Sequence, residues 1–330
     1  MNQTSHNDSE FDSWIYNPNI VPALYLSMFP IALLLNGVAA WVSLHIKATS
    51  TFVVYLKNLV AADIILTLLI PINVARDFPG VSNTIYILSC FLSSIFYGTQ
   101  YICIALLGVI SLDRFFKIMM PRSKLFGQNL TFSKLMSGSV WLILGGSTLP
   151  NMILNNKSVA NITEISTCME LKGPAGLMVH ERIVICQNIF FWLISVVISV
   201  CYICIGKKVI QSFRKSGSSN TQGKQKIRLR VFLVIIVFFG SFGPYHIIQI
   251  PYAFQRVKSS SYTGSFLSKR LAKDLSHLLS CTNICMDPLL YVFLCREFKE
   301  KLMSMMKNVS VLFRVASADK AEGTLPQIRR

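Results

Sequence analysis

The sequence predicts an all-α membrane protein, a seven-transmembrane helix bundle with a short amphipathic eighth helix. Three observations support this fold class. Of the 330 residues, 52% are hydrophobic and only 14% are charged, whereas about 25% of residues are charged in a typical soluble domain. Seven apolar stretches are long enough to cross a bilayer, which takes about 20 helical residues. Lysine and arginine gather in alternate connecting segments.

The seven apolar stretches follow one another along almost the whole chain. They cover residues 21–46, 52–73, 86–112, 133–154, 183–206, 229–254 and 272–294. We therefore expect an extracellular N-terminal tail over 1–20, one membrane domain over 21–294, and an amphipathic helix with a cytoplasmic tail over 295–330. Residues 296–306 have the mixed charged and apolar composition of a helix that lies on a membrane surface.

The positive residues predict the orientation. They are concentrated after the third span, after the fifth span and in the tail, and such loops stay in the cytoplasm. The N-terminus is then extracellular and the C-terminus cytoplasmic. Four N-x-S/T sequons fall on the predicted outer side, where glycosylation occurs: Asn2, Asn7, Asn156 and Asn161.

The net charge of +17 does not indicate nucleic-acid binding, because the positive residues are divided among loops by side of the membrane. Some of them remain in the second and third outer loops, where a basic rim would attract an anionic small molecule. A solvated loop with incidental lysines explains them equally well. Membrane lipids are the other partner that this composition implies.

Two of the nine cysteines differ from the rest. Cys90 lies at the outer start of the third span and Cys168 in the second outer loop, where the environment is oxidising. We expect them to form a disulfide across the mouth of the bundle. Cys295, at the inner end of the last span, is a candidate for palmitoylation.

Polar residues inside the spans point to a switch. An ionisable group there costs several kcal/mol unless it faces the interior and finds a partner. Asp63 and Asp287 lie within the second and seventh spans, with Asn36 and Asn283 at similar depth. Interhelical hydrogen bonding explains such residues, but together they also predict a water-accommodating network with two arrangements and a Na⁺ site at the two aspartates.

The inner membrane edge carries an acid beside an arginine. We expect Asp113 to pair with Arg114, which lowers the cost of holding Arg114 near the membrane and frees it when the inner helix ends separate. Pro244 interrupts the backbone ladder of the sixth span and permits a kink there. Tyr202 and Tyr291 can reach inward when that helix moves.

These motifs resemble the class A, or rhodopsin-like, G-protein-coupled receptors over nearly the whole chain. The resemblance rests on Asn36, Asp63, Asp113-Arg114-Phe115, Trp141, Phe242-Gly243-Pro244 and Asp287-Pro288-Leu289-Leu290-Tyr291. It implies a plasma-membrane signal receiver that activates a heterotrimeric G protein, needs no cofactor and is not an enzyme.

A closer match is to the Gi-coupled purinergic receptors for ADP and UDP-sugars, and most of all to the ADP receptor subgroup. The matching stretches include residues 55–58, 149–154, 171–174, 244–252 and 282–295. The resemblance implies Gi coupling and a nucleotide pocket near the outer ends of spans three to seven. The implied pocket residues are Tyr97, Tyr101, Asn151, Lys172, His180, His246, Tyr252 and Lys273.

The chain departs from this branch at Gln249, where the branch has Arg or Lys to hold phosphate. A neutral amide cannot supply that charge, so Lys273 becomes the expected main anchor, unless Asp274 neutralises it in a structural ion pair. A lysophospholipid or another organic anion is the alternative ligand. A transporter or channel is the alternative class, although the internal repeats and broken helix pairs common in transporters are not seen in the sequence.

Overall fold

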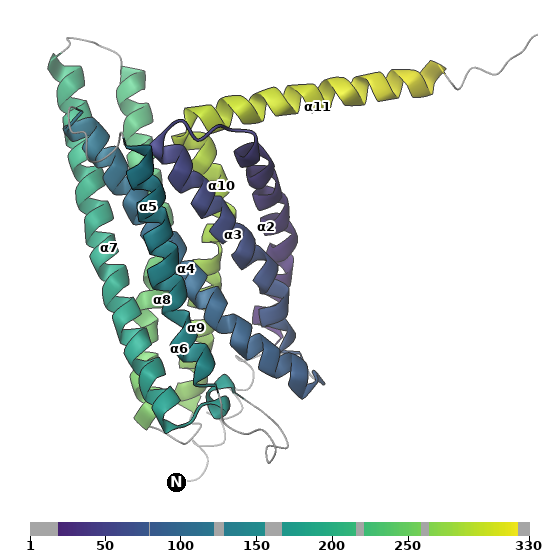
Figure 1. Ribbon diagram of the computed structural model, residues 1–330, viewed down its shortest axis with the longest axis vertical. Coiled ribbons are helices and arrows are strands. Elements are labelled where there is room, and N and C mark those ends of the chain that lie inside the picture. Colours follow the sequence, from purple (N-terminus) through teal and green to yellow (C-terminus); the bar gives the residue numbers. More distant parts are fainter. Residues whose placement is uncertain are drawn as a thin grey trace, which may run out of the picture.

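The computed structural model describes residues 19–78, 80–121, 129–155, 167–215, 221–258 and 264–322. Every regular element among these residues is helical. The long helices stand side by side in one bundle, and the last helix crosses its end (Figure 1). The four predicted sequons, Asn2, Asn7, Asn156 and Asn161, lie outside the described residues.

The helices follow the predicted spans in order and confirm the fold class. Six stretches of the described chain are long and apolar enough to cross a membrane. The seventh span is divided at Thr282 into two helices. The bounds are α2 (Ile20–Leu44), α3 (Thr51–Ala75), α4 (Asn83–Met119), α7 (Pro174–Lys215), α8 (Thr221–Lys258), α9 (Gly264–Cys281) and α10 (Asn283–Leu294).

The fourth predicted span is not one regular helix. It comprises α5 (Leu130–Val140), a π-helical turn η1 (Trp141–Gly145) and α6 (Thr148–Ile153). A π turn inserts extra backbone into the helical ladder and shifts its register. At the start of this turn, Trp141 Nε1 donates to Asn58 Oδ1 of α3 at 3.0 Å. This hydrogen bond holds the irregular part of the span against α3.

Side-chain caps set the starts of several helices. Ser50 Oγ accepts the backbone N–H of Val53 at 3.4 Å at the start of α3. Asn129 Oδ1 accepts the N–H of Thr131 at 2.9 Å at the start of α5. These bonds satisfy backbone donors that have no partner within the helix, so the polar residues before the apolar stretches mark where the helices begin.

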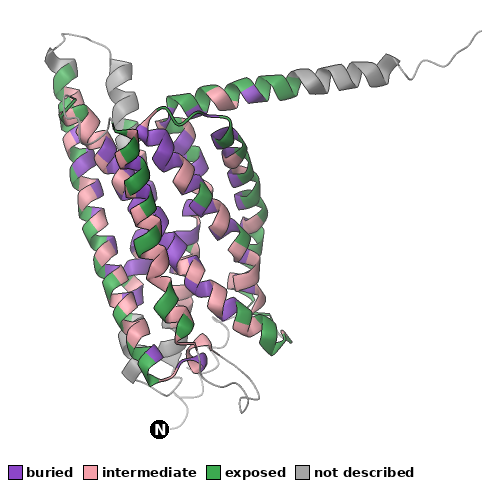
Figure 2. Cartoon of the chain, in the orientation of Figure 1, coloured by how far each residue is buried: buried purple, intermediate pink, exposed green. Residues whose placement is uncertain are grey.

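α4 is the central helix of the bundle. It packs against α3, α7 and the pieces of the fourth span. Ile104 and Leu106 on it are fully buried. Gly98 permits close approach to α6, because a methyl group there would overlap Thr148 Cγ2. Buried residues face inward along the helices while exposed residues face outward (Figure 2).

The outward faces of the bundle are strongly apolar, as a bilayer requires. Large aliphatic side chains remain more than half exposed on helices throughout the bundle. Among them are Leu34, Leu68, Leu142, Ile153, Leu193 and Ile247. In water such a surface would aggregate, so the exposed faces agree with the predicted membrane environment.

The eighth helix, α11 (Arg296–Glu322), is longer than the predicted 296–306. No proline or glycine occurs within it, so nothing in the backbone chemistry ends it early. Phe298 is fully buried and packs its ring 5.8 Å from that of Tyr291, which anchors α11 to the bundle. Cys295 is buried here, and its Sγ accepts the Phe298 N–H at 3.4 Å.

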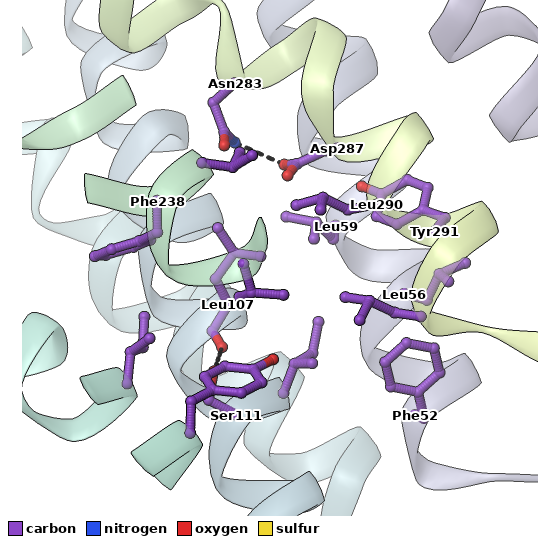
Figure 3. Close-up of a pocket in the computed structure, with 16 residues that line it drawn as sticks. Phe52, Leu56, Leu59, Leu107, Ser111, Phe238, Asn283, Asp287, Leu290 and Tyr291 are labelled. Carbon is purple, nitrogen blue, oxygen red and sulfur yellow. Dashed lines mark hydrogen bonds between the residues drawn. The ribbon is translucent and has the colours of Figure 1, made fainter. Parts of the chain in front are cut away.

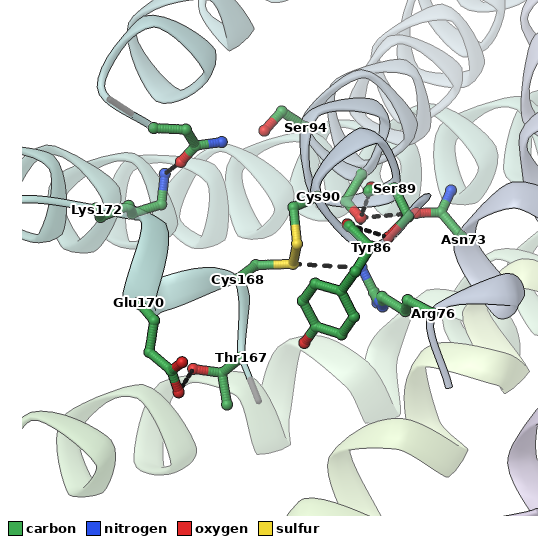
Figure 4. The surroundings of a disulfide bond; sticks show 12 residues. Asn73, Arg76, Tyr86, Ser89, Cys90, Ser94, Thr167, Cys168, Glu170 and Lys172 are labelled. Atoms are coloured by element: carbon green, nitrogen blue, oxygen red, sulfur yellow. Dashed lines mark hydrogen bonds between the residues drawn. A yellow bond between two sulfur atoms is a disulfide. The ribbon is translucent and has the colours of Figure 1, made fainter. Parts of the chain in front are cut away.

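The predicted disulfide is confirmed. Cys90 of α4 is bonded to Cys168, the first residue of the short 3-10 helix η2 (Cys168–Leu171), with the Cα atoms 5.5 Å apart (Figure 4). The bond ties the second outer loop to the start of the central helix.

Replacing Cys168 with Ala should loosen this loop and lower the stability of the receptor. Removing a disulfide typically costs about 2–4 kcal/mol, so the midpoint of thermal unfolding of the purified receptor should fall by several degrees. Cys186→Ala is the matched control, because Cys186 is an unbonded, exposed cysteine of α7. Equal melting midpoints for the two variants would contradict the expectation.

Candidate functional site

Three of the predicted pocket residues meet at the end of the bundle that carries the disulfide, which we call the outer end after its predicted orientation. Lys172 Nζ, after η2, donates to Asn151 Oδ1 of α6 at 2.8 Å and to the Asn151 carbonyl at 3.0 Å. His180 Nδ1, on α7, lies 3.3 Å from the same Asn151 Oδ1. Asn151 Nδ2 donates to Ser94 of α4 at 2.9 Å. The outer loop, α4, α6 and α7 thus converge on one amide.

Lys172 is the most informative member of this group. Its side chain is buried, with 6% exposure, and burial lowers the pKa of its amine to about 8, so the amine is still mostly protonated at neutral pH. Its third acceptor is Asn155 Oδ1 at 2.6 Å. All three acceptors are neutral oxygens, and no carboxylate pairs with Lys172 among the described residues. Within the described ranges, this buried positive charge therefore has no carboxylate counter-ion.

His246 and Tyr101 also meet, but deeper in the bundle. The Tyr101 hydroxyl lies 3.1 Å from His246 Nε2, and His246 Nδ1 lies 2.8 Å from the Phe242 carbonyl. The imidazole stacks on Phe191 with ring centres 3.7 Å apart. Asn188 Nδ2 donates to the His246 carbonyl at 2.8 Å. Both ring nitrogens of His246 are thus engaged, so a phosphate contact there must break one of these bonds.

Tyr97 lies in an aromatic cluster that the sequence did not predict. The cluster surrounds His277 of α9, whose Nδ1 lies 2.7 Å from the Tyr25 hydroxyl. The His277 ring centre lies 4.9 Å from that of Tyr97 and 5.0 Å from that of Tyr245. Its Nε2 is buried and has no hydrogen-bond partner among the described residues. We call these four side chains, with Phe96 at 5.9 Å, the His277 cluster.

The remaining predicted pocket residues are less closely grouped. Gln249 is buried, and its Oε1 has no hydrogen-bond partner in the described part of the chain. Lys273 Nζ lies 3.4 Å from Asp274 Oδ1, so the structural ion pair considered from the sequence is present. Tyr252 belongs to α8, but its side chain lies outside the described residues.

The polar residues within the spans lie together near the middle of the bundle. The Tyr291 hydroxyl donates to Asp63 Oδ2 at 2.6 Å and so joins α10 to α3. One turn away on α10, Asn283 Nδ2 donates to Asp287 Oδ2 at 2.7 Å (Figure 3). Asn36 Nδ2 donates to the Ile284 carbonyl at 2.9 Å and brings α2 into the same network.

Three oxygens of this network have no partner among the described residues. They are Asn36 Oδ1, Asn283 Oδ1 and Asp287 Oδ1, and all three are buried. A buried acceptor without a partner costs about 1–3 kcal/mol. These three unpartnered oxygens could bind a water molecule or a hard cation, because both interact with oxygen lone pairs.

An interior pocket runs from this network toward the inner end of the bundle (Figure 3). Asn283, Asp287 and Tyr291 line one part of it, and Ser111 and Tyr202 line another. Most of the other lining residues are aliphatic or aromatic side chains of α3, α4, α7, α8 and α10. α8 continues through Pro244, and Phe242 and Pro288 are buried beside the network.

The expected pairing of Asp113 with Arg114 is wrong. Asp113 Oδ2 lies 2.9 Å from Lys117 Nζ, one turn further along α4. Its Oδ1 accepts the hydroxyl of Thr51 at 2.6 Å. The Arg114 guanidinium instead lies 3.9 Å from the centre of the Phe52 ring. Residues four apart share a helix face while neighbours point away from each other, and this favours Lys117 as the partner.

Arg114 therefore lies between α3 and α10 at the end of the bundle that carries α11. Its Nη2 donates to the Leu294 carbonyl at 3.5 Å. Neither the ring of Phe52 nor this carbonyl neutralises the guanidinium, so its charge remains available to a partner at this end.

Comparison with known proteins decides the family. The profile described as 7 transmembrane receptor (rhodopsin family) matches residues 35–291. The chain is 41% identical to purinoceptor 13 of Homo sapiens over 288 residues, which is 87% of this chain and 81% of that protein. It is 35% identical to purinoceptor 14 of Bos taurus over 86% of this chain and 84% of that protein.

The chain belongs to the rhodopsin family of seven-transmembrane receptors. Within this family, the similarity to purinoceptors 13 and 14 places the chain in the purinoceptor branch. The chain is also 35% identical to G-protein coupled receptor 87 of Mus musculus, over 91% of this chain and 82% of that protein. The protein is therefore a multi-pass plasma-membrane receptor that acts on a G protein, and the transporter, channel and enzyme classes are set aside.

Sequence reasoning missed several residues that the structure brings into contact with the predicted ones: Ser94, Asn155, Asn188 and His277. All are polar residues in or beside apolar stretches, where burial without a partner is costly. That signal is visible in the sequence, but it does not say which helix supplies the partner.

Replacing Lys117 with Met should lower basal signalling of the receptor. Without the lysine, Asp113 keeps only its hydroxyl partner, and its unbalanced negative charge attracts the Arg114 guanidinium through space, which makes Arg114 less available to the G protein. An ion pair worth about 1 kcal/mol shifts a two-state population about fivefold. Basal G-protein activation, measured as nucleotide exchange at equal surface expression, reports the effect. Lys117→Arg keeps the pair and should signal normally; basal activity that is unchanged in Lys117→Met contradicts this role.

Proposed function

We propose that this receptor senses an extracellular nucleotide, of the ADP or UDP-sugar type, and signals through a Gi-type G protein. The observation that carries the proposal is Lys172, a buried amine whose partners in the described part of the chain are all neutral oxygens. A buried charge without a counter-ion is costly, and an anionic ligand would remove that cost.

Two groups of residues in this half of the bundle suit the two parts of a nucleotide. His180 and Asn151 supply hydrogen-bonding groups beside the amine, which favours phosphate. Tyr97 and the His277 cluster supply aromatic faces on which a base or ribose can pack. The purinoceptor names of the relatives support the same ligand class.

The orientation is part of the proposal. The basic segments between α7 and α8 and in α11 mark the cytoplasmic end, where Arg114 meets the Gi-type protein and the lysines of α11 meet anionic lipid headgroups. The disulfide and Lys172 then face the extracellular side, with the N-terminal tail.

A lysophospholipid is the second candidate ligand. The observation that favours it is Gln249, a buried neutral residue where a phosphate-binding cation was expected. The apolar rings of the His277 cluster would also accept an acyl chain. Cells that express the receptor should respond to ADP or a UDP-sugar by Gi activation; a response to lysophosphatidic acid alone would favour the second candidate.

Replacing Lys273 with Ala should weaken a nucleotide agonist about tenfold or more, because a charge-assisted hydrogen bond in a desolvated pocket contributes roughly 1.5–3 kcal/mol. Gln249→Arg should strengthen it by adding the missing charge. Agonist dose–response curves at matched surface expression measure both effects, with Gln249→Glu as the control that adds the opposite charge. If neither Lys273→Ala nor Gln249→Arg moves the potency, the anionic pocket is elsewhere.

We also propose that Asp63 and Asp287, with Asn36 and Asn283, form a Na⁺ site. The residues fit such an ion, because three buried amide and carboxylate oxygens lack partners among the described residues and sodium takes oxygen ligands. The cation would supply the positive charge that two neighbouring carboxylates require.

Replacing Asp63 with Asn should alter activation without loss of surface expression, because the side chain keeps an acceptor for Tyr291 and loses only its charge. Agonist potency of the wild-type receptor should depend on Na⁺ concentration, and that of Asp63→Asn should not. Tyr291→Phe is the companion variant that removes the hydrogen bond and keeps the charge. Equal sodium sensitivity in wild type and Asp63→Asn argues against the site.

A further inference from the structure

Arg76 lies at the mouth of the bundle, immediately after α3. Its Nη1 donates to Ser93 Oγ of α4 at 2.5 Å and lies 3.9 Å from Cys168 Sγ of the disulfide (Figure 4). Its Nε lies 3.8 Å from Asp77 Oδ1, and the side chain is 24% exposed. Arg76 is thus held against the tethered outer loop and is still reachable from the extracellular side.

Contacts along α4 and α9 show how deep Arg76 and Lys273 lie along the axis of the bundle. On α4, Ser93 contacts Arg76, and Tyr97 lies one turn deeper. On α9, Lys273 is one turn above His277, whose ring contacts Tyr97. One helical turn rises about 5.4 Å. Arg76 and Lys273 therefore lie at the same level, one turn outward of the Tyr97–His277 contact.

The charges at the outer ends of α3 and α9 act on one another. Burial raises the pKa of the Asp77 carboxyl, and the negative charge of Asp274 raises it further. The positive charges of Arg76, Arg270 and Lys273 lower it. Arg270 and Lys273 also lie 3.9 Å and 3.4 Å from the Asp274 carboxylate. Three basic groups, Arg76, Arg270 and Lys273, thus lie within electrostatic reach of the same two acids, and Glu170 acts on Tyr86 together with Arg76 and Arg270.

The α8 side of the mouth offers fewer positive charges to an anion. Gln249 on α8 is neutral, and both ring nitrogens of His246 are engaged within the bundle. Among the described side chains of the outer half of α8, none is a cation that could face an anion. The positive charge of the mouth therefore lies on the α3 and α9 side and on the loop residue Lys172.

We propose that Arg76 and Lys273 form an anion-binding subsite at the outer ends of α3 and α9, with the His277 cluster beneath it. The ligand class is an organic anion whose phosphate lies between the two cations and whose planar or apolar part enters the aromatic cluster. The guanidinium can hold a phosphate with two parallel hydrogen bonds. This inference rests on the proposed function and deepens it, because it names residues at the outer ends of α3 and α9 that would hold the phosphate.

The Nε2 of His277, which lacks a hydrogen-bond partner among the described residues, supports the same placement. It is buried among four aromatic rings, where a polar atom without a partner is costly. A ligand hydroxyl, amide or base nitrogen entering the cluster would satisfy it. The two cations and this nitrogen lie about one turn apart in depth, which matches the separation between the phosphate and the ring system of a nucleotide.

The test is ligand binding to the purified full-length receptor. The probes are ADP, UDP-glucose, lysophosphatidic acid and inorganic pyrophosphate, each measured at low and high salt. Arg76→Gln removes the charge and keeps a donor for Ser93. The matched control is Arg182→Gln, an exposed arginine of α7 outside the subsite. We expect Arg76→Gln to weaken the best-binding anion about tenfold or more and to flatten its salt dependence, and Arg182→Gln to do neither.

A second pair of variants separates charge from structure. Gln249→Arg should restore part of the affinity lost in Arg76→Gln, and should do so more strongly there than in the wild-type receptor. Arg76→Met is the second neutral variant if Arg76→Gln does not reach the surface. If both neutral variants fail to fold while Arg76→Lys folds, or if Arg76→Gln binds every probe as the wild type does, Arg76 is structural and the proposal is overturned.

The outcomes also separate this proposal from the nucleotide function. Binding of lysophosphatidic acid but not of ADP or UDP-glucose contradicts the nucleotide function, and Arg76→Gln then tests the subsite on the lipid phosphate. Nucleotide binding that is insensitive to Arg76→Gln leaves the function intact and overturns the subsite. A wild-type receptor that binds none of the four probes contradicts both.

Discussion

The apolar membrane around the bundle is the constraint on which the rest of the structure depends. No water is available there, so every polar group within a span must find its partner inside. Asp63 meets this requirement through Tyr291 at 2.6 Å, and the amide nitrogen of Asn36 does so through the Ile284 carbonyl at 2.9 Å. These bonds join α2, α3 and α10, and the apolar core packs around them on both sides of the central helix α4.

The same constraint divides the receptor into two ends with different chemistry. The outer end holds the cations Lys172 and Arg76, beside a loop that the Cys90–Cys168 disulfide ties to α4. The inner end holds Arg114 between α3 and α10, with its charge not neutralised by Phe52 or the Leu294 carbonyl. The polar network and the interior pocket lie between these ends, and α9 and α10, separated at Thr282, connect them along one chain segment.

Much of this architecture could be predicted from the sequence, because the length of an apolar stretch is fixed by bilayer thickness and is visible residue by residue. The spans and the level of Asp63 and Asp287 follow from that reasoning. The Cys90–Cys168 bond follows from the position of both cysteines on the predicted outer side. The π turn at Trp141 could not be predicted, because it is stabilised by a hydrogen bond to Asn58 on another helix. The length of α11 was underestimated, although the absence of proline and glycine from residues 296–322 is visible in the sequence. The burial of Phe298, which anchors α11 to the bundle, depends on tertiary packing and could not be predicted.

The sequence by itself determined the fold class, the receptor family and the polar residues that must be buried. The tertiary structure decided which groups meet. Asp113 pairs with Lys117 and not with Arg114. Among the described residues, Lys172 is held by neutral oxygens. His277 contacts Tyr97 and Arg76 contacts Ser93, although no motif marks them. The physical reason is that partner choice depends on the distances and rotations between helices, which packing sets and which the spacing of residues along one helix does not encode.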